Sequence, residues 1–375
     1  MTLCPGLGSC QVCGSTSPSI SRGVNVCSLC LSTKADEALA VTDRIHENSR
    51  AEFGLPPFPP RKGLPCGVCA NNCLIPDQEV GYCGLVFNSQ GKVERRGGTS
   101  NRGVLEWYYD SLPTNCVAWW FCPGCTGAGS PKYSHTSGRA EKGYDNLAVF
   151  YGACSFDCLF CQNWHYRRLA LSNLPTVSSE ALASKVSESV SCICFFGGDP
   201  SPQMPHALET SRLAVAGAGR DQRILRICWE TNGHMNPDYL DQAMELSLQT
   251  GGNVKFDLKF WTEGLARGIC GISNIHSLRN FERAGTKYFE ARPDLPVLAA
   301  STLLIPGYVD EAEVGSIAEF ISSIDDRIPY TLLAFSPHYM MTDLPTTSRE
   351  QALRCREEAL KHLRTVRIGN ELLLS

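Results

Sequence analysis

Short apolar runs alternate with segments of helical periodicity over most of the chain, from about residue 146 onward. The runs occupy residues 147–151, 192–196, 224–229, 254–258, 297–305 and 330–335. Strands that alternate with helices are typical of βα units, whose strands lie side by side in a mainly parallel sheet. The pattern therefore predicts an α/β domain over residues 146–375, with six βα units.

Capping residues mark the ends of two of these helices. Asn236 and Pro237 supply an N-cap and a proline at the first helical position, and Gly251 can close the same helix. Asp310 precedes a segment in which apolar residues recur with helical spacing. These boundaries agree with the predicted alternation of strands and helices.

The first 65 residues have a different pattern. Residues 35–48 have the spacing of one helix, and His46 on it is expected to be a surface or packing residue rather than a metal ligand. Residues 54–65 are rich in proline, which lacks the N–H and fixes φ, so this stretch is predicted to be a stiff linker. We place domains at 1–33, 34–65, 66–145 and 146–375.

Residues 66–145 are predicted to form a cysteine-rich, mostly β, metal-binding segment. A hairpin is expected around residues 88–91. Aromatic residues gather at 107–121, next to three cysteines. This stretch could wall a site or bridge to the α/β domain, and the alternative is a small hydrophobic cluster under a long loop.

Composition excludes several functional classes. A net charge of -4 over 375 residues gives no general signature of polyanion binding, so nucleic acid is possible as a partner but not favoured. No apolar stretch approaches the ~20 residues of a membrane span, and residues 1–6 lack the basic start of a signal peptide. Twenty cysteines without a secretory signal indicate metal ligation in a reducing cytosol, so we expect a cytoplasmic protein.

Two groups of four cysteines precede the α/β domain. Cys10, Cys13, Cys27 and Cys30 form C-x2-C-x13-C-x2-C, which favours a zinc ribbon, with iron as the alternative and Cys4 as a spare thiol. The second group, within 18 residues, predicts a closed metal site that holds either zinc or an auxiliary iron–sulfur cluster. Its members are Cys66, Cys69, Cys73 and Cys83. Cys116, Cys122 and Cys125 are further possible ligands, although only three lie close together in sequence.

A third arrangement follows the first apolar run of the α/β domain. Cys154, Cys158 and Cys161 have the spacing C-x3-C-x2-C, so one short loop can hold three irons of a cubane cluster. Cluster cysteines usually come in fours, so a loop with three suggests an iron left open for chemistry. A zinc knuckle is the alternative interpretation.

The loop Cys154-Ser-Phe-Asp-Cys-Leu-Phe160-Cys161-Gln-Asn-Trp resembles the signature of radical S-adenosylmethionine (SAM) enzymes, in the branch that contains pyruvate formate-lyase activating enzyme. The resemblance implies a partial (β/α)6 barrel with a [4Fe-4S] cluster whose open iron binds SAM, and Phe160 beside the cofactor. Reductive cleavage of SAM then yields a 5′-deoxyadenosyl radical that abstracts hydrogen. An oxygen-labile cluster and a low-potential electron donor of the ferredoxin or flavodoxin type, in an anaerobic host, are also implied.

Further motifs resemble the same family in order along the chain. Gly197-Gly198-Asp199-Pro200 is similar to its Gly-Gly-Glu-Pro motif, which holds the methionyl amine of SAM, with aspartate in place of glutamate. Glu230-Thr231-Asn232-Gly is similar to its Asp-Thr-Asn-Gly, and Asp257-Leu-Lys259 matches its Asp-Leu-Lys. The resemblance makes Glu230, Thr231 and Asp257 candidates for a monovalent cation and places Lys259 near the methionine, with an Asp257–Lys259 salt bridge as the alternative.

The last two motifs are weaker. Ser301-Thr302 stands where the family has an arginine near SAM, so that contact is lost or replaced. Pro337-His338-Tyr occupies the place of a Pro-Tyr-His motif, which makes His338 a candidate for the adenosine side.

The function expected from the resemblance is radical abstraction of hydrogen from a protein or peptide, as in glycyl-radical activation. Radical modification of RNA or a small metabolite is one alternative. The other is a non-catalytic iron–sulfur electron carrier or scaffold.

Overall fold

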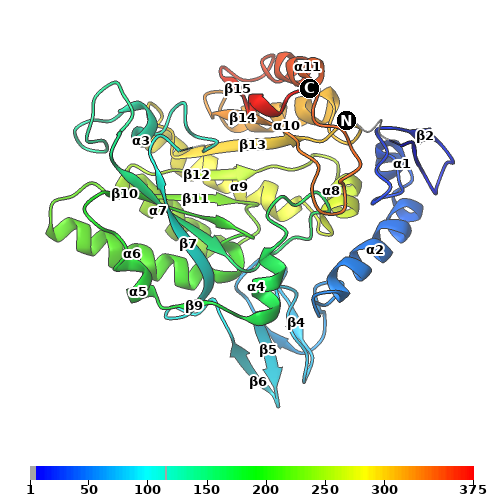
Figure 1. Ribbon diagram of the computed structural model, residues 1–375, viewed down its shortest axis with the longest axis horizontal. Coiled ribbons are helices and arrows are strands. Elements are labelled where there is room, and N and C mark those ends of the chain that lie inside the picture. Colours follow the sequence, from blue (N-terminus) through cyan, green and yellow to red (C-terminus); the bar gives the residue numbers. More distant parts are fainter. Residues whose placement is uncertain (1–5, 115) are drawn as a thin grey trace.

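A nine-stranded sheet organises the molecule in the computed structural model, which describes residues 6–114 and 116–375 (Figure 1). Its strand order is β15-β14-β13-β12-β11-β10-β8-β7-β9. The strands are β7 (Gly103–Ser111), β8 (Asp145–Tyr151), β9 (Thr176–Val177), β10 (Val190–Gly197), β11 (Arg226–Thr231), β12 (Val254–Asp257), β13 (Leu298–Leu304), β14 (Tyr330–Ala334) and β15 (Val366–Gly369).

Seven of these strands, from β8 to β15 without β9, are parallel to their neighbours. Each new strand adds to the same edge of the sheet, which is the winding of an open barrel. The helices between them are α4 (Tyr166–Ser172), α5 (Ser179–Ala183), α6 (Met204–Arg220), α7 (Pro237–Thr250), α8 (Glu263–Cys270), α9 (Ile275–Tyr288), α10 (Glu311–Ile324) and α11 (Arg349–Ala359). The predicted α/β class with a mainly parallel sheet is confirmed.

The sheet is larger than the apolar runs predict. All six runs form strands, but β7 and β9 extend the sheet antiparallel on one edge, and β15 adds a seventh parallel strand on the other. Aromatic residues at 107–109 therefore belong to β7 rather than to a cluster under a long loop. Both sequence-predicted caps form: Asn236 accepts from the Asp238 N–H at 2.9 Å, and Asp310 accepts from the Glu313 N–H at 3.0 Å.

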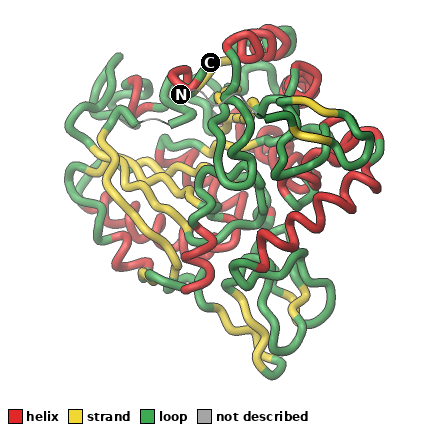
Figure 2. Tube along the Cα trace, turned by 45° about the vertical axis from the view of Figure 1, so that its right-hand side comes forward, coloured by secondary structure: helices red, strands yellow, loops and turns green. Residues whose placement is uncertain are grey.

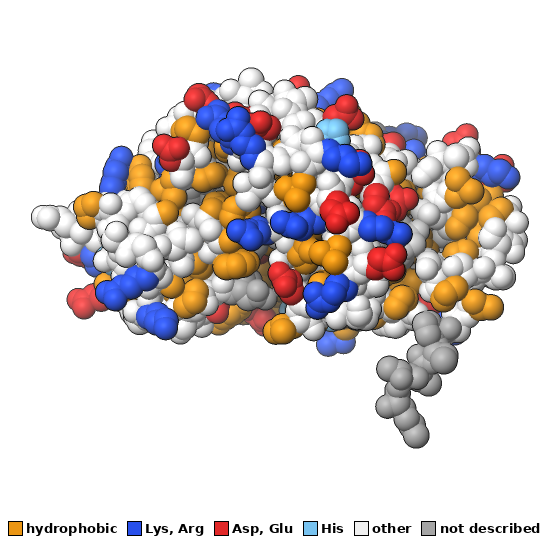
Figure 3. All heavy atoms as spheres, turned by 90° about the horizontal axis from the view of Figure 1, so that it is seen from above, with side chains coloured by type: hydrophobic (Ala, Val, Ile, Leu, Met, Phe, Trp, Pro, Cys, Tyr) orange, Lys and Arg blue, Asp and Glu red, His pale blue; other side chains and the backbone are white. Residues whose placement is uncertain are grey.

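The residues before the sheet form shorter elements. They are β1 (Gly8–Ser9), β2 (Thr16–Ser17), α1 (Ser28–Thr33), α2 (Ala35–Ala51), β3 (Leu64–Pro65), β4 (Leu74–Ile75), β5 (Val86–Ser89) and β6 (Lys92–Arg95). One short helix, α3 (Pro123–Thr126), lies between the sheet strands β7 and β8. Figure 2 shows β3–β6 at one end of the molecule, and β5–β6 is the hairpin expected around residues 88–91. On the face in Figure 3, acidic and basic side chains are interspersed.

Helix α1 packs directly on α8. A Cβ on Gly264 would lie 1.9 Å from the Leu31 carbonyl oxygen, and one on Gly268 would lie 2.3 Å from the Leu31 side chain. The hydroxyl of Tyr308 fixes the preceding segment, since it accepts from the Ser21 N–H at 3.1 Å and donates to the Val26 carbonyl at 2.9 Å. The cysteine-rich start is therefore held on the α/β domain by close backbone contact.

A buried ion pair anchors residues 116–144 to the sheet. Arg226 on β11 donates to both carboxylate oxygens of Glu141, at 2.9 and 2.7 Å, and both side chains are almost fully buried. Ser134 and Ser191 also donate to that carboxylate, each at 2.7 Å, and the His135 N–H donates to it at 2.8 Å. Although burial opposes ionisation, these partners keep the pKa of Glu141 below its usual value.

We predict that Glu141→Ala lowers the free energy of unfolding by about 3–5 kcal/mol, because it leaves the Arg226 guanidinium buried without a counter-charge. Urea unfolding followed by circular dichroism measures the loss. Arg283→Ala, which breaks a pair with Asp241 at the surface, is the control and should cost about 1 kcal/mol or less. Equal effects of the two substitutions would contradict the prediction.

Candidate active site

A cavity of about 200 Å³ opens at the carboxyl ends of the parallel strands. This edge is where barrels of βα units carry their catalytic residues. The sequence-predicted residues that line the cavity are Cys154, Cys158, Phe160, Cys161, Gly197, Gly198, Asp199, Glu230, Thr231, Asn232, Asp257 and Lys259. Of the other two candidates, neither Pro200 nor His338 is among the lining residues, and the His338 Nδ1 lies 2.9 Å from the Ser336 carbonyl oxygen.

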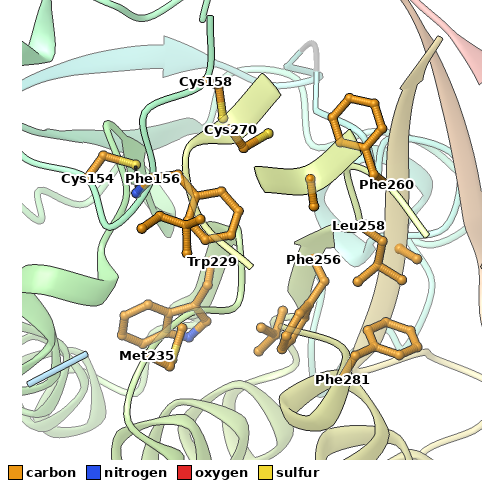
Figure 4. Packing of buried hydrophobic residues seen from close by; sticks show 14 of the residues in the cluster. Cys154, Phe156, Cys158, Trp229, Met235, Phe256, Leu258, Phe260, Cys270 and Phe281 are labelled. Atoms are coloured by element: carbon orange, nitrogen blue, oxygen red, sulfur yellow. Dashed lines mark hydrogen bonds between the residues drawn. The ribbon is translucent and has the colours of Figure 1, made fainter. Parts of the chain in front are cut away.

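The cysteine loop leaves β8 and lies over the end of α8. The Asp157 N–H donates to the Cys270 carbonyl at 2.9 Å, and the Leu159 N–H donates to the Ile269 carbonyl at 2.9 Å. Figure 4 shows the side chains of Cys158 and Cys270 next to each other, with Cys154 farther away. Cys270 is thus a fourth thiol near the loop, although it belongs to another element.

Buried charges fix the middle of the loop. Asp157, which is fully buried, accepts from Arg167 at 2.5 Å, from His46 at 2.8 Å and from Ser49 at 3.0 Å. Arg50 lies 3.5 Å from the same carboxylate. Burial alone would raise the pKa of Asp157, but Arg167 and the other partners hold it well below its usual range. His46 therefore packs against the loop, in agreement with the expectation that it is a surface or packing residue rather than a metal ligand.

The three loop thiols are protonated when they carry no metal. Burial raises the pKa of the Cys161 thiol to about 11 and raises those of Cys154 and Cys158 well above their ordinary values. Metal binding at these thiols must therefore release protons.

The end of β10 is built from glycines because the cysteine loop approaches it closely. A Cβ on Gly198 would lie 2.2 Å from the Ala153 carbonyl oxygen. Gly197 has a φ of +107°, and a Cβ added to it would lie 2.5 Å from the Tyr151 nitrogen. The backbone N–H groups of Gly198 and Asp199 donate to Tyr151 and Ala153. The strand end and the loop are thus joined by their backbones.

Asp199 links the ends of two neighbouring strands. Its carboxylate accepts from the Ser201 N–H at 2.7 Å, from the Asn232 N–H at 2.6 Å and from the Thr231 hydroxyl at 3.1 Å. Burial raises the pKa of Asp199 despite these hydrogen bonds. Asp199, which is shorter than the glutamate of the family motif, therefore supports the strand ends. The backbone of Gly197 and Gly198 beside it still faces the cavity.

Two ion pairs lie at the next strands. Lys259 contacts Asp257 at 3.1 Å, so the salt bridge considered from the sequence is present, and Ser301 donates to the other Asp257 oxygen at 2.7 Å. Glu230 pairs with Lys255 at 3.2 Å. Carboxylates, a hydroxyl and an ammonium thus meet at one wall of the cavity.

Ser301, which stands where the family has an arginine near SAM, lines the cavity. Other lining residues were not named as site candidates from the sequence. They are Gln162, Asn163, Tyr166, Phe196, Leu303, Leu333, Ala334, Ser336, Asn370 and Leu373. Asn370 and Leu373 follow β15, so recognising 366–369 as a strand would have placed its end at this edge.

The comparisons with known proteins agree with this geometry. Residues 148–321 match the radical SAM superfamily. The chain carries a radical SAM domain. A putative glycyl-radical enzyme activating enzyme of Methanocaldococcus jannaschii is 23% identical over 224 residues, which are 59% of this chain and 80% of that protein.

Two solved structures are also similar to parts of the chain. A domain of pyruvate-formate lyase-activating enzyme from Bacteroides vulgatus has 23% identity over 47% of this chain and 98% of its own, with a TM-score of 0.37. Streptococcus suis SuiB bound to S-adenosylmethionine has 11% identity over 58% of this chain and 47% of its own, with a TM-score of 0.40.

The radical SAM domain implies a [4Fe-4S] cluster and SAM, and the residues of the cavity fit both groups. The loop offers three thiols. The glycine-built end of β10 leaves backbone uncovered beside them, and the strand ends beyond it carry polar side chains. None of the helices that the structure describes is both long and apolar enough to cross a bilayer.

The N-terminal thiols converge tightly. Among the described residues, the sulfurs of Cys10, Cys13, Cys27 and Cys30 form the only group of candidate ligands that all lie within 4.8 Å of one another, and Cys13 and Cys27 are 3.9 Å apart. Four sulfurs at ~2.3 Å from one tetrahedral zinc ion would have similar separations. Cys4 lies outside the described residues.

The second cysteine group is close-set but wider. Burial and the neighbouring thiols of the group raise the pKa values of Cys69 and Cys83, and Arg95 donates to the Cys66 sulfur at 3.5 Å. The segment that carries them is tied to the radical SAM domain: Asn71 donates to the Ser155 carbonyl at 2.8 Å, and residue 69 forms a β-bridge with residue 235. This group therefore lies next to the cysteine loop.

We predict that Asp157→Asn lowers the free energy of unfolding by about 3–5 kcal/mol at pH 7, because two arginines then share no buried anion. The pKa of Asp157 is lower in the folded than in the unfolded chain, so its stabilisation is present above about pH 4 and is lost as the pH falls further. Urea midpoints of both proteins from pH 7 to pH 3 should differ by a constant amount down to about pH 5 and then converge.

Ser49→Ala is the control for this substitution, since it removes one neutral donor and should cost about 1 kcal/mol. A gap that widens below pH 4 would show that Asp157 does not supply the charge.

Proposed function

We propose that the protein is a radical SAM enzyme that abstracts hydrogen from a protein or peptide, as a glycyl-radical activating enzyme does. The observation that carries the proposal is the single cavity in which the Cys154–Cys158–Cys161 loop meets the glycine-built end of β10 and the polar ends of β11 and β12. The similarity to a putative glycyl-radical enzyme activating enzyme supports the substrate class.

Each group of residues that lines the cavity has a proposed role in binding the cluster or SAM. Cys154, Cys158 and Cys161 would ligate three irons, and the backbone at Gly197 and Gly198 would receive the amine of SAM. When bound, the cluster and SAM supply reductive cleavage and a 5′-deoxyadenosyl radical. Lys259, held by Asp257, offers an ammonium to the SAM carboxylate.

The other cysteine groups are proposed to hold different metals. The tight N-terminal group suits one zinc ion. The 66–83 group suits an auxiliary iron–sulfur cluster, because its sulfurs spread wider than one ion requires, as those of the Cys154 loop also do. Its contact with Ser155 gives it a position from which electrons from a ferredoxin- or flavodoxin-type donor could reach the loop.

We predict that anaerobically reconstituted protein, given dithionite and SAM, forms 5′-deoxyadenosine, and that Cys158→Ala reduces this product to background because one iron loses its ligand. Liquid chromatography with mass detection measures the product. Cys355→Ala is the matched control, since Cys355 is buried in α11 away from the cavity. If the Cys158→Ala variant formed as much 5′-deoxyadenosine as the unaltered protein, the proposal that the protein is a radical SAM enzyme would be wrong.

Metal analysis by mass spectrometry separates the two N-terminal groups. Cys13→Ser/Cys27→Ser should lose about one zinc with iron unchanged, and Cys66→Ser/Cys73→Ser should lose about four irons with zinc unchanged. Loss of zinc from the second variant and not the first would reverse the assignment.

A further inference from the structure

The inner face of the sheet carries several small side chains beside longer polar ones. Residues alternate between the two faces of a strand. On the face toward the helices, β10 and β11 carry Ile193, Phe195, Ile227 and Trp229, all fully buried. The opposite face carries Ala148, Cys192, Cys194, Cys228 and Lys255.

Small inner residues leave a second cavity. Barrel interiors are ordinarily filled by bulky branched side chains. Here a space of about 110 Å³ remains, well above the ~10–15 Å³ that a single water occupies. Phe196 and Glu230 line both this cavity and the one that holds the Cys154 loop, so the two adjoin.

The segment after β7 closes this inner cavity and adds thiols to it. Trp120 donates to the Thr331 hydroxyl at 3.3 Å, and that hydroxyl donates to the Val117 carbonyl at 3.1 Å, so the segment reaches across to β14. Cys116 and Cys122 come from this segment. Five thiols then line one cavity: Cys116, Cys122, Cys192, Cys194 and Cys228.

Strand register brings the thiols of the sheet together. Cys194 and Cys228 are directly paired on β10 and β11 and point to the same face. Cys192 lies one inner position before Cys194, and its thiol donates to the Asn146 side chain at 3.4 Å. Cys194 contacts the Lys255 nitrogen and Cys228 lies directly opposite it, so these two are the thiols of the sheet that lie beside the ammonium.

The buried ammonium of Lys255 lies between a thiol of the sheet and a thiol of the segment after β7. The Lys255 nitrogen is 3.1 Å from the Cys116 sulfur, 3.4 Å from the Cys194 sulfur and 3.2 Å from a Glu230 oxygen, and the residue is 2% exposed. A charge removed from water needs anionic partners. The Glu230 carboxylate supplies one such partner. Thiolates that carry a metal cluster would supply the others, with Lys255 as a hydrogen-bond donor to their sulfurs.

We propose that the inner cavity holds an iron–sulfur cluster ligated by Cys116, Cys122, Cys194 and Cys228, beside Lys255. A single ion fits less well, because among the described residues no three of these sulfurs lie within 4.8 Å of one another. Four cysteines ligate both [2Fe-2S] and [4Fe-4S] clusters. The site shares no ligand with the Cys154 loop, so it does not depend on SAM cleavage.

The test counts iron in the full chain after anaerobic reconstitution with iron and sulfide. The reference variant lacks the other iron ligands through Cys154→Ala, Cys158→Ala, Cys161→Ala, Cys66→Ser and Cys73→Ser. We expect it to retain two or four irons, with visible absorption that dithionite bleaches. Adding Cys116→Ser and Cys194→Ser should abolish both signals, whereas adding Cys355→Ser should preserve them.

Far-UV circular dichroism checks that each variant is folded. A folded reference variant without iron overturns the proposal, and so does one whose iron survives Cys116→Ser/Cys194→Ser; the thiols would then be packing groups or the wall of a substrate pocket. If the reference variant does not fold, the same double substitution in the otherwise unaltered chain decides. A loss of two or four irons relative to Cys355→Ser supports the cluster, and unchanged iron rejects it.

Discussion

The buried carboxylate of Asp157 is the constraint on which the cysteine loop depends. A charge in the interior persists only where partners replace water, and here the partners come from two helices. Arg167 belongs to α4, just after the loop, while His46, Ser49 and Arg50 belong to α2, more than 100 residues earlier. Docking of α2 therefore supplies three of the four side chains that surround the buried charge of the loop.

Arg50 extends this dependence to the second cysteine group. Its guanidinium lies over the Tyr82 ring, 3.5 Å from the ring centre, and donates to the Tyr82 carbonyl at 2.5 Å. Tyr82 directly precedes Cys83, and the same arginine contacts Asp157. A single side chain therefore contacts both the cysteine loop and the segment that carries the 66–83 group, and that segment lies behind the loop.

Local patterns sufficed for much of the α/β domain, because apolar runs and caps depend on neighbouring residues. The six runs became strands, and Asn236 and Asp310 cap helices as expected. The strand β7 was missed because its exposed aromatic residues do not alternate cleanly, and β15 because Arg367 interrupts its short apolar pattern. The cysteine loop and its cavity could be anticipated from motifs, whereas the partnership of His46 with Asp157 joins residues that no local pattern relates.

Local sequence patterns also could not show that the thiols of the inner cavity lie together. Cys192, Cys194 and Cys228 look like ordinary members of buried strands, and buried cysteine commonly serves as a small hydrophobic residue. Only the parallel register, together with the segment that crosses to β14, reveals that they face one cavity and one ammonium. Because Glu230 pairs with Lys255 and also lines the outer cavity, the charge held inside affects how freely that carboxylate can engage a ligand outside. The two cavities are therefore electrostatically linked, whatever each of them binds.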